Sequence, residues 1–242
     1  QGRKLGTSSF TMGMLDEGAG ELDALAFANR AESLGAMLGA GAALDGGNAY
    51  LSALKENLDD SLGLFADMLR QPRFDQKEID RVRATWIAGI GQEKARPNGA
   101  ALRVLPPLLY GKGHPYAIPF SGSGTEASIA ALTRQDLLDF HNQWVRPDNA
   151  TLIVVGDTTL EEVVPLLEKH FGDWKAATPA VAAAALPEVE RAGGAAAYPV
   201  DPPRAGQVRR RRDLEVGEAR QRDRVEVARR EREVERRVLE VV

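Results

Sequence analysis

The most informative stretch for the fold is residues 37–69, which read MLGAGAALDGGNAYLSALKENLDDSLGLFADML. Small and alternating residues from Met37 to Leu54 flank the turn Asp45-Gly46-Gly47, a pattern that predicts two short strands. The next apolar residues follow at spacings of four, three and four, which predicts an amphipathic helix with this buried face: Leu58, Leu62, Phe65 and Leu69. Two strands followed directly by a helix favour an α+β protein.

Two further helices are predicted on either side of this stretch. One spans residues 22–34, and Gly35 is suited to end it. Its expected apolar face consists of Leu22, Leu25, Ala28 and Leu34. The other begins at Asp75, which has Glu78 at capping-box spacing. Its expected face consists of Ile79, Val82, Trp86 and Ile90.

The later part of the chain alternates less regularly. Thr133 and Asp136 predict another helix start, and its buried stripe is expected to be Leu137, Phe140 and Trp144. Residues 150–155, ATLIVV, are a candidate buried strand, and a helix is expected to follow to about Phe171. Because helices and strands come in uneven groups, the pattern favours an α+β fold over strict β-α-β alternation.

Composition divides the chain into four parts. Residues 1–175 carry the regular patterns and are expected to form one folded domain. Residues 176–196 are rich in alanine and proline and are typical of a linker. Residues 197–207 start with a short apolar run that predicts the first strand of a second unit, and residues 208–242 form a charged tail.

The tail differs from everything before it. Of its 35 residues, 12 are arginine and nine are acidic, and it contains no lysine, aromatic residue, serine, threonine or proline. Such a composition is typical of a solvated charged helix or a disordered tail. Translation of a GC-rich gene in a wrong reading frame is an alternative interpretation. A basic arm for nucleic acid is the least favoured interpretation, because the acidic residues dilute the positive field.

The whole-chain composition excludes several classes of function. The formal net charge of −4 does not predict nucleic-acid binding, and the absence of cysteine excludes disulfides and thiolate chemistry. No run approaches the ~18 apolar residues of a membrane span. The three histidines lie at 114, 141 and 170, too far apart for ligand spacing; His114 is expected in a loop, His141 facing solvent and His170 near a helix end.

Residues 6–15 read GTSSFTMGML and resemble the start of the insulinase/pitrilysin family of zinc metallopeptidases. Active members of that family carry an H-x-x-E-H motif here, in which two histidines bind zinc and the glutamate is the general base. A more distant glutamate completes the zinc ligands in the family. The resemblance therefore implies an insulinase-like domain with a mainly antiparallel sheet covered by helices on one face.

The zinc chemistry of the family is absent from the matching positions. The resemblance places the two histidines at Ser9 and Gly13, the base at Met12 and the distal glutamate at Gly89. A hydroxyl, a thioether and two glycines do not supply the three nitrogen, sulfur or carboxylate ligands that a catalytic zinc needs. We therefore predict no catalytic residue and no zinc cofactor in this chain, and degenerate positions at these four sites.

The resemblance extends well beyond this segment. Residues 110–116, YGKGHPY, and residues 144–157, WVRPDNATLIVVGD, are similar to family segments, and the latter is the most specific match. Residues 201–207 resemble the opening of the following domain. The stretch that leads into the first helix in the family is not present, so we expect the N-terminus of the domain to be missing.

The edge strand that binds substrate in active members corresponds here to Gly39, Ala40, Gly41 and Ala42. A peptide could still pair with this backbone by strand addition, although side chains that would set its register are absent. The resemblance implies a non-catalytic domain that pairs with an active zinc peptidase domain to enclose a peptide. The alternatives are a fragment of a two-domain zinc metalloendopeptidase whose catalytic half lies elsewhere, and a purely structural scaffold subunit. Bacterial members of the family are often exported to the periplasm, but these residues do not indicate a compartment.

Overall fold

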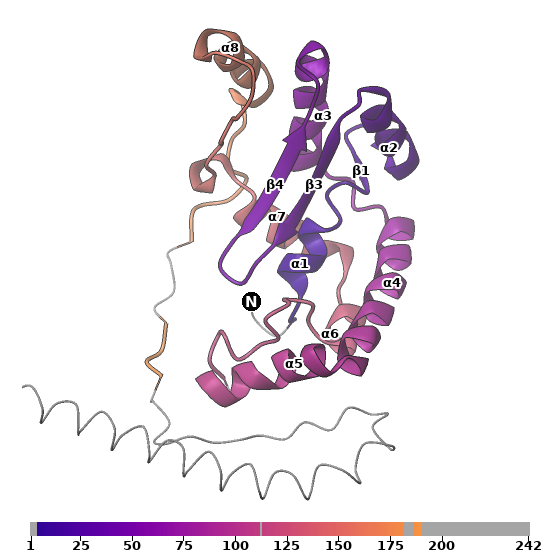
Figure 1. Ribbon diagram of the computed structural model, residues 1–242, viewed down its shortest axis with the longest axis vertical. Helices are drawn as coiled ribbons and strands as arrows, with labels where there is room; N and C mark the ends of the chain where they lie inside the picture. Colours follow the sequence, from indigo (N-terminus) through magenta and orange to yellow (C-terminus); the bar gives the residue numbers. More distant parts are fainter. Residues whose placement is uncertain (1–3, 112, 182–185, 190–242) are drawn as a thin grey trace, which may run out of the picture. The chain divides into compact units, whose positions relative to one another are not determined.

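The computed structural model of this protein describes residues 4–111, 113–181 and 186–189. All of them belong to the first of two compact units, which spans Gln1–Tyr198. The predictions for residues 197–207 and 208–242 lie outside the described residues. The elements in chain order, shown in Figure 1, are α1 (Thr7–Met12), β1 (Gly18–Ala19), β2 (Leu22–Asp23), α2 (Ala24–Ser33), β3 (Met37–Ala42), β4 (Gly47–Ser52), η1 (Lys55–Asn57), α3 (Leu58–Arg70), α4 (Gln76–Ala95), α5 (Pro97–Tyr110), α6 (Glu126–Ala130), α7 (Arg134–Trp144), η2 (Pro147–Asn149) and α8 (Leu160–Phe171).

The predicted pair of strands is confirmed as an antiparallel hairpin. β3 and β4 pair in register from Met37 opposite Ser52 to Ala42 opposite Gly47. Around the turn, the Ala43 N–H donates to the Gly46 carbonyl at 2.7 Å. Apolar residues on one face of the hairpin pack against the core, and they are Leu38, Ala40, Ala42, Ala49 and Leu51.

One hydrophobic core joins this hairpin to the surrounding helices. α1 lies next to the lower end of β3 in Figure 1, and it contacts both β3 and α7. The largest side chains that are fully buried are Phe10, Phe27, Phe74, Met14, Leu15 and Met68. Burying side chains of this size stabilises the fold by about 1.5–3 kcal/mol each. The helices on one side of the hairpin confirm the α+β architecture expected from the sequence.

Of the two helix N-termini predicted from capping residues, one has the predicted hydrogen bonds and the other does not. Thr133 and Asp136 form the predicted capping box, in which each side chain bonds the other residue's backbone N–H. Asp75 is the N-cap of α4, but the capping box predicted with Glu78 is wrong. Arg73 Nε donates to Asp75 at 2.8 Å, and Arg81 Nε donates to Glu78 at 2.6 Å. Both carboxylates therefore have charged partners, which form stronger hydrogen bonds than backbone amides do.

Several predicted side-chain positions are wrong because tertiary contacts decided them. Leu25, assigned to the buried face of the first predicted helix, is exposed, and Phe27 is buried in its place. Trp144 was expected in the buried stripe of α7 and is 48% exposed. His141 was expected to face solvent, but it is 7% exposed, and its Nε2 lies 2.8 Å from the Leu69 carbonyl oxygen. The stripe that packs inward on α7 therefore includes His141.

The strand predicted at residues 150–155 is not formed. The backbone there has no regular structure, and Ile153 and Val155 are 81% and 91% exposed. Within the described part of the chain no strand pairs with it, because the two small sheets are β1–β2 and β3–β4. A strand with apolar residues on both faces needs neighbours that cover both faces. The segment has the composition of a buried strand and lacks those neighbours.

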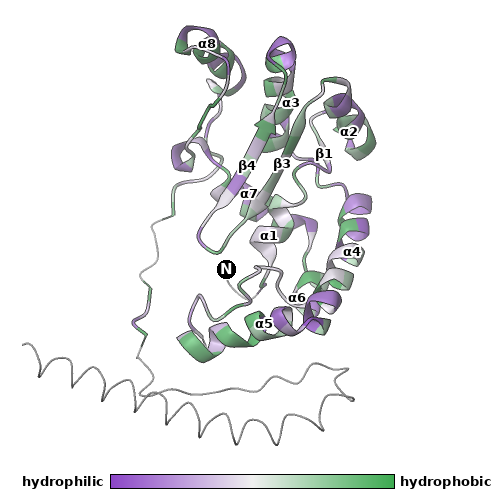
Figure 2. Ribbon diagram, viewed as in Figure 1, coloured by the Kyte–Doolittle hydropathy of each residue, from purple (hydrophilic) through white to green (hydrophobic). Residues whose placement is uncertain are grey.

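A second apolar surface lies on α5. This helix is not among the predicted elements, and it starts with Pro97 at its first turn. Figure 2 shows it as largely hydrophobic, and its exposed apolar side chains are Leu102, Val104, Leu105, Leu108 and Leu109. Among the described helices none is long and apolar enough to cross a membrane.

Candidate functional site

The short helix α1 carries the first three positions that the resemblance assigns to zinc chemistry. It starts after Gly6, whose φ of 87° lies in the left-handed region that favours glycine. A Cβ added at Gly6 would lie 2.8 Å from Ile129 Cδ1, so glycine also allows α1 to begin tightly against α6. Phe10, Thr11 and Met12 are buried, and they hold α1 rigidly against the core.

The side chains of Ser9 and Met12 contact different neighbours. Ser9 Oγ lies against Gly122, where an added Cβ would be 2.6 Å from that oxygen. Met12 packs under the hairpin, because a Cβ added at Gly47 would be 3.1 Å from Met12 Cε. Ser9 thus contacts the loop before α6, and Met12 packs against β4.

Trp86 lies between the other two positions. A Cβ added at Gly13 would lie 3.4 Å from Trp86 Cζ3, and Trp86 packs edge-on against Phe10 with ring centroids 5.5 Å apart. Gly89 follows Trp86 on α4 by about one helical turn, and no atom lies within 4 Å of a Cβ added there. An indole ring and an open space thus stand between α1 and α4, where the resemblance places the metal.

The residues present do not fit a catalytic zinc. Thioether packing at Met12, the hydroxyl of Ser9 and the missing side chains of Gly13 and Gly89 provide no imidazole or carboxylate. Across the described residues, no three His, Cys, Asp or Glu side chains form a group that could hold a metal ion. No step of a reaction is therefore derived through zinc at this position.

The open space beside Gly89 is a pocket of about 390 Å³. Its walls come from α4, from Glu17 and from the loop before α6, and the lining residues are Glu17, Arg81, Val82, Thr85, Trp86, Gly89, Ile90, Glu93 and Ser123. That volume lies within the range of about 300–1,000 Å³ usual for small-molecule sites. Gly89, to which the resemblance assigns the distal zinc ligand of the family, therefore lines this pocket.

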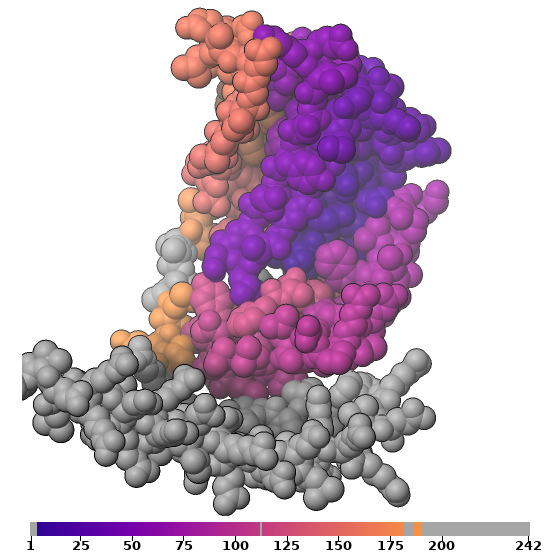
Figure 3. Space-filling model, viewed as in Figure 1, coloured from indigo at the N-terminus to yellow at the C-terminus, as the bar shows by residue number. Residues whose placement is uncertain are grey.

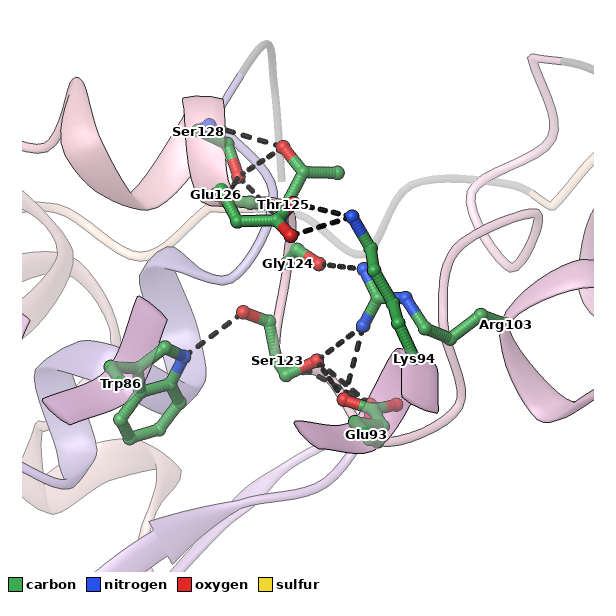
Figure 4. Close-up of polar contacts among 10 residues, drawn as sticks. Trp86, Glu93, Lys94, Arg103, Ser123, Gly124, Thr125, Glu126 and Ser128 are labelled. Atoms are coloured by element: carbon green, nitrogen blue, oxygen red, sulfur yellow. Dashed lines mark hydrogen bonds and ion pairs between the residues drawn. The ribbon is translucent and has the colours of Figure 1, made fainter. Parts of the chain in front are cut away.

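A polar network forms one wall of this pocket (Figure 4). Glu93 accepts hydrogen bonds from Arg103 Nη1 at 3.1 Å, from Ser123 Oγ at 2.8 Å and from Ser121 Oγ at 2.9 Å. The Trp86 indole N–H donates to the Ser123 carbonyl at 3.0 Å. Arg103 also donates to the Gly124 carbonyl. The network fixes the indole and joins α4, α5 and the loop before α6.

A second ion pair supports the same loop farther toward solvent. Lys94 Nζ donates to both carboxylate oxygens of Glu126 at 2.6 Å. The Lys94 ammonium, helped by a backbone N–H, holds the pKa of Glu126 below its ordinary value. Thr125 and Ser128 form the capping box that starts α6 directly behind this pair. The loop is therefore anchored to α4 at two successive points.

The opposite wall of the pocket carries a different charge arrangement. Arg81 donates to Glu78 at 2.6 Å and also to Glu17. The hydrogen bonds that Arg81 donates to Glu78 and Glu17 raise the pKa of its guanidinium above the ordinary value. Each carboxylate that lines the pocket thus already has a cationic partner, Glu17 in Arg81 and Glu93 in Arg103.

The predicted substrate edge is confirmed as a strand, and its binding role stays a prediction. Gly39, Ala40, Gly41 and Ala42 all lie in β3, which pairs on one side with β4 and has no partner on its other edge among the described residues. Because Ala43 and Gly46 are hydrogen-bonded, the alternation of an antiparallel pair places Ala40 and Ala42 at non-hydrogen-bonded positions. Their backbone N–H and C=O groups therefore point toward the open edge.

The outer face of the hairpin is covered unevenly. Tyr50 is exposed, yet its ring covers Gly39 opposite it, where an added Cβ would be 3.0 Å from the Tyr50 hydroxyl. This face of the hairpin, violet in Figure 3, lies on the surface toward the viewer. Gly39 is thus buried beneath the Tyr50 ring, while Ala40, Gly41 and Ala42 are half-buried.

The remaining histidines have structural surroundings. His114 lies in the loop after α5, as expected, and stacks on Tyr110 with ring centroids 5.0 Å apart. His170 lies in the last turn of α8, also as expected, and its Nε2 is 2.7 Å from Asp59 on α3. None of the three histidines lines the pocket beside Gly89.

Two family models match this chain. One, described as insulinase (peptidase family M16), matches residues 2–107, and one described as peptidase M16 inactive domain matches residues 131–223. The chain belongs to the insulinase family. A crystal structure of a peptidase M16 inactive domain from Pseudomonas fluorescens is 29% identical with a TM-score of 0.68, and the match covers 79% of this chain and 45% of that chain. This agreement confirms the insulinase-like α+β fold.

Other similar proteins are longer than this chain. An uncharacterized zinc protease of Mycobacterium leprae is 26% identical over 167 residues, which is 69% of this chain and 37% of the relative. The first half of the periplasmic protease PqqL from Escherichia coli has the same fold, with a TM-score of 0.64, 22% identity, and coverage of 77% of this chain and 41% of that chain. The chain thus spans less than half the length of these insulinase-family proteins.

Sequence reasoning missed the residues that build the pocket wall. Trp86 was assigned to the core, and neither Glu93 nor Arg103 stood out as a site residue. They are separated from Ser123 by 30 and 20 residues along the chain. No local pattern pairs such distant polar side chains, so only the folded structure identifies this network.

Proposed function

We propose that this insulinase-family chain is a non-catalytic domain that pairs with an active zinc peptidase domain and binds unfolded peptide along β3. The observation that carries the proposal is the open edge of β3 beside a position that lacks zinc donors. The outward backbone groups of Ala40 and Ala42 provide the hydrogen bonds that an extended peptide needs. This chain would hold the peptide while the chemistry takes place in the partner domain.

Exposed apolar surface supports the pairing with another domain. Ile153 and Val155 are apolar residues of a strand without neighbours, and α5 exposes a row of leucines. Contiguous apolar surface of this kind usually marks an interaction site. The insulinase relatives are more than twice as long as the matched region, which leaves room for a second domain in the same protein.

The proposal is tested by peptide binding. A fluorescein-labelled, unstructured peptide is titrated with the purified chain, and its fluorescence anisotropy is recorded. We expect saturable binding that is insensitive to scrambling of the peptide sequence outside its apolar residues, because backbone pairing supplies most of the contacts. Absence of saturable binding, both for the chain alone and after addition of a catalytic insulinase-family domain, would refute the proposal in favour of a purely structural scaffold.

Metal content provides a separate prediction. The purified chain is expected to retain much less than one equivalent of zinc after dialysis, because its four mapped positions offer no zinc ligand. Elemental analysis measures the ratio of zinc to protein, and an insulinase-family protein with an intact H-x-x-E-H motif, purified in the same buffers, serves as the positive control. One tightly bound zinc per chain would contradict the prediction.

The segment 150–155 is predicted to be free for a partner. Replacing Ile153 and Val155 with aspartate should change the free energy of unfolding by less than about 0.5 kcal/mol per site, because both side chains are exposed. The same change should lower the fluorescence of bound anilinonaphthalene sulfonate, a dye that reports exposed apolar surface. Urea unfolding measures the first effect, and Ile129→Asp in the core is the destabilising control. A large loss of stability in the double variant would show that the segment is buried.

A further inference from the structure

We infer that the pocket beside Gly89 binds one bulky apolar side chain, such as phenylalanine or leucine, of a bound peptide. The inference rests on the proposed function and specifies which residues of a peptide this chain selects. The region where the family carries a charged zinc site would thus have become an apolar specificity pocket. Its position next to α1, which contacts β3, places it within the same substrate-facing part of the domain.

The walls of the pocket are suited to an apolar group. Val82, Trp86 and Ile90 line it from α4, and the two bulkiest of them are held in place. Ile90 is buried, and Trp86 is fixed by its hydrogen bond to Ser123 and by its edge-on contact with Phe10. A rigid aromatic wall allows a ligand ring or branched chain to gain contact area without first ordering the site.

The charges around the pocket do not call for a charged ligand. Glu93 accepts three hydrogen bonds, from Arg103 and two serines, so its carboxylate is satisfied. Glu17 is paired with Arg81 on the opposite wall. A cation entering the pocket would lose hydration without finding a free carboxylate, and an anion would meet both carboxylates and a guanidinium, Arg81, that is already paired with two carboxylates. A neutral apolar group loses nothing comparable.

The absence of a side chain at Gly89 creates the space for this group. Gly89 lines the pocket and nothing lies within 4 Å of an added Cβ, so a larger residue at this exposed turn of α4 has room to extend into it. Gly91 is a matched control on the same helix. It also has open space around an added Cβ, and it does not line the pocket. Both glycines lie in the interior of a helix, where a leucine is favourable for helix stability.

The test uses capped amino acids, which do not depend on pairing with β3. The ¹⁵N-labelled chain is titrated with N-acetyl-phenylalaninamide and N-acetyl-leucinamide, and then with the lysine and glutamate analogues. The indole N–H signal of Trp86 is followed by NMR and assigned with a Trp86→Phe variant. We expect saturable shifts of this signal with the two apolar amides and at least about tenfold weaker binding of the charged ones.

The two glycine variants then locate the site. Gly89→Leu should abolish the response of the Trp86 signal to the apolar amides, and Gly91→Leu should leave it unchanged, while thermal unfolding shows that both variants are folded. The inference is overturned if the apolar amides do not shift the signal, if the lysine analogue binds as well, or if Gly89→Leu keeps full binding. None of these results tests peptide pairing along β3, which is measured separately by fluorescence anisotropy. The pocket proposal can therefore fail while the proposed function holds.

Discussion

Replacing Arg103 with methionine is expected to lower the free energy of unfolding by about 3 kcal/mol, at the lower end of the values for breaking a buried ion pair. The Arg103 side chain is only 9% exposed, and that of its partner Glu93 is 21% exposed. Methionine conserves the aliphatic stem and removes the charge, so Glu93 is left in a poorly hydrated site with two serine hydroxyls as donors. The effect stays at the lower end because those two hydrogen bonds remain.

The same change should loosen the loop that holds Trp86. Arg103 donates to Ser123 Oγ at 2.8 Å and to the Gly124 carbonyl, and the Trp86 indole donates to the Ser123 carbonyl. Loss of the guanidinium is therefore expected to shift the Trp86 indole N–H signal as well as the urea midpoint. A stability effect without any change at Trp86 would show that the network does not position the indole.

A neighbouring ion pair provides the matched control for Arg103. Lys94→Met removes the ion pair with Glu126. Because the Lys94 and Glu126 side chains are 43% and 38% exposed, this change should lower the free energy of unfolding by less than about 1 kcal/mol. The double variant Glu93→Gln/Arg103→Met should recover part of the loss, because a neutral amide is less costly to bury than an unpaired carboxylate. Equal effects of Arg103→Met and Lys94→Met in urea unfolding would contradict the assignment of the Glu93–Arg103 pair as buried.

Replacing Ala40 with proline is expected to weaken peptide binding by at least about tenfold, which corresponds to about 1.4 kcal/mol. Ala40 lies at a non-hydrogen-bonded position of the hairpin, so its N–H points to the open edge of β3. Proline removes this donor and places its ring where the peptide backbone would pair. Fluorescence anisotropy with the labelled peptide measures the change in affinity.

The neighbouring strand position separates binding from folding. Gly41 is at a hydrogen-bonded position opposite Asn48, so Gly41→Pro should disrupt the hairpin and lower stability. Ala40→Pro should lower the urea midpoint less than Gly41→Pro does, because Ala40 contributes no hydrogen bond to β4. Ala40→Ser keeps the N–H and should bind peptide normally. Unchanged peptide affinity in a folded Ala40→Pro variant would exclude β3 as the pairing edge.

Local patterns predicted those parts of the fold whose causes are local. The hairpin of residues 37–52 was predictable because turn residues and alternation act over a few residues. The helix at 58–70 was predictable from its spacing, and the start at Thr133 from its capping box. α5 was missed, since prolines at 106 and 107 interrupt the usual helical signal.

Predictions that depended on neighbours failed where the neighbours were not local. Residues 150–155 have the apolar composition of a strand, but strand formation requires partners along its edges, and none pairs with it in the described residues. His141 was expected in solvent because it lies on the polar side of the stripe predicted from Leu137, Phe140 and Trp144. A hydrogen bond to Leu69, 72 residues earlier, and an edge contact with Phe74 make its burial favourable.

The sequence by itself determined the membership of the insulinase family and the α+β class, and it predicts that the zinc donors are lost at Ser9, Met12, Gly13 and Gly89. These conclusions depend only on residue types at given spacings. The tertiary structure decided that Trp86 and an open pocket lie beside Gly13 and Gly89, and that Glu93 and Arg103 pair with each other next to that pocket. Such pairing depends on which distant side chains the fold brings together, and it cannot be predicted from periodicity along the chain.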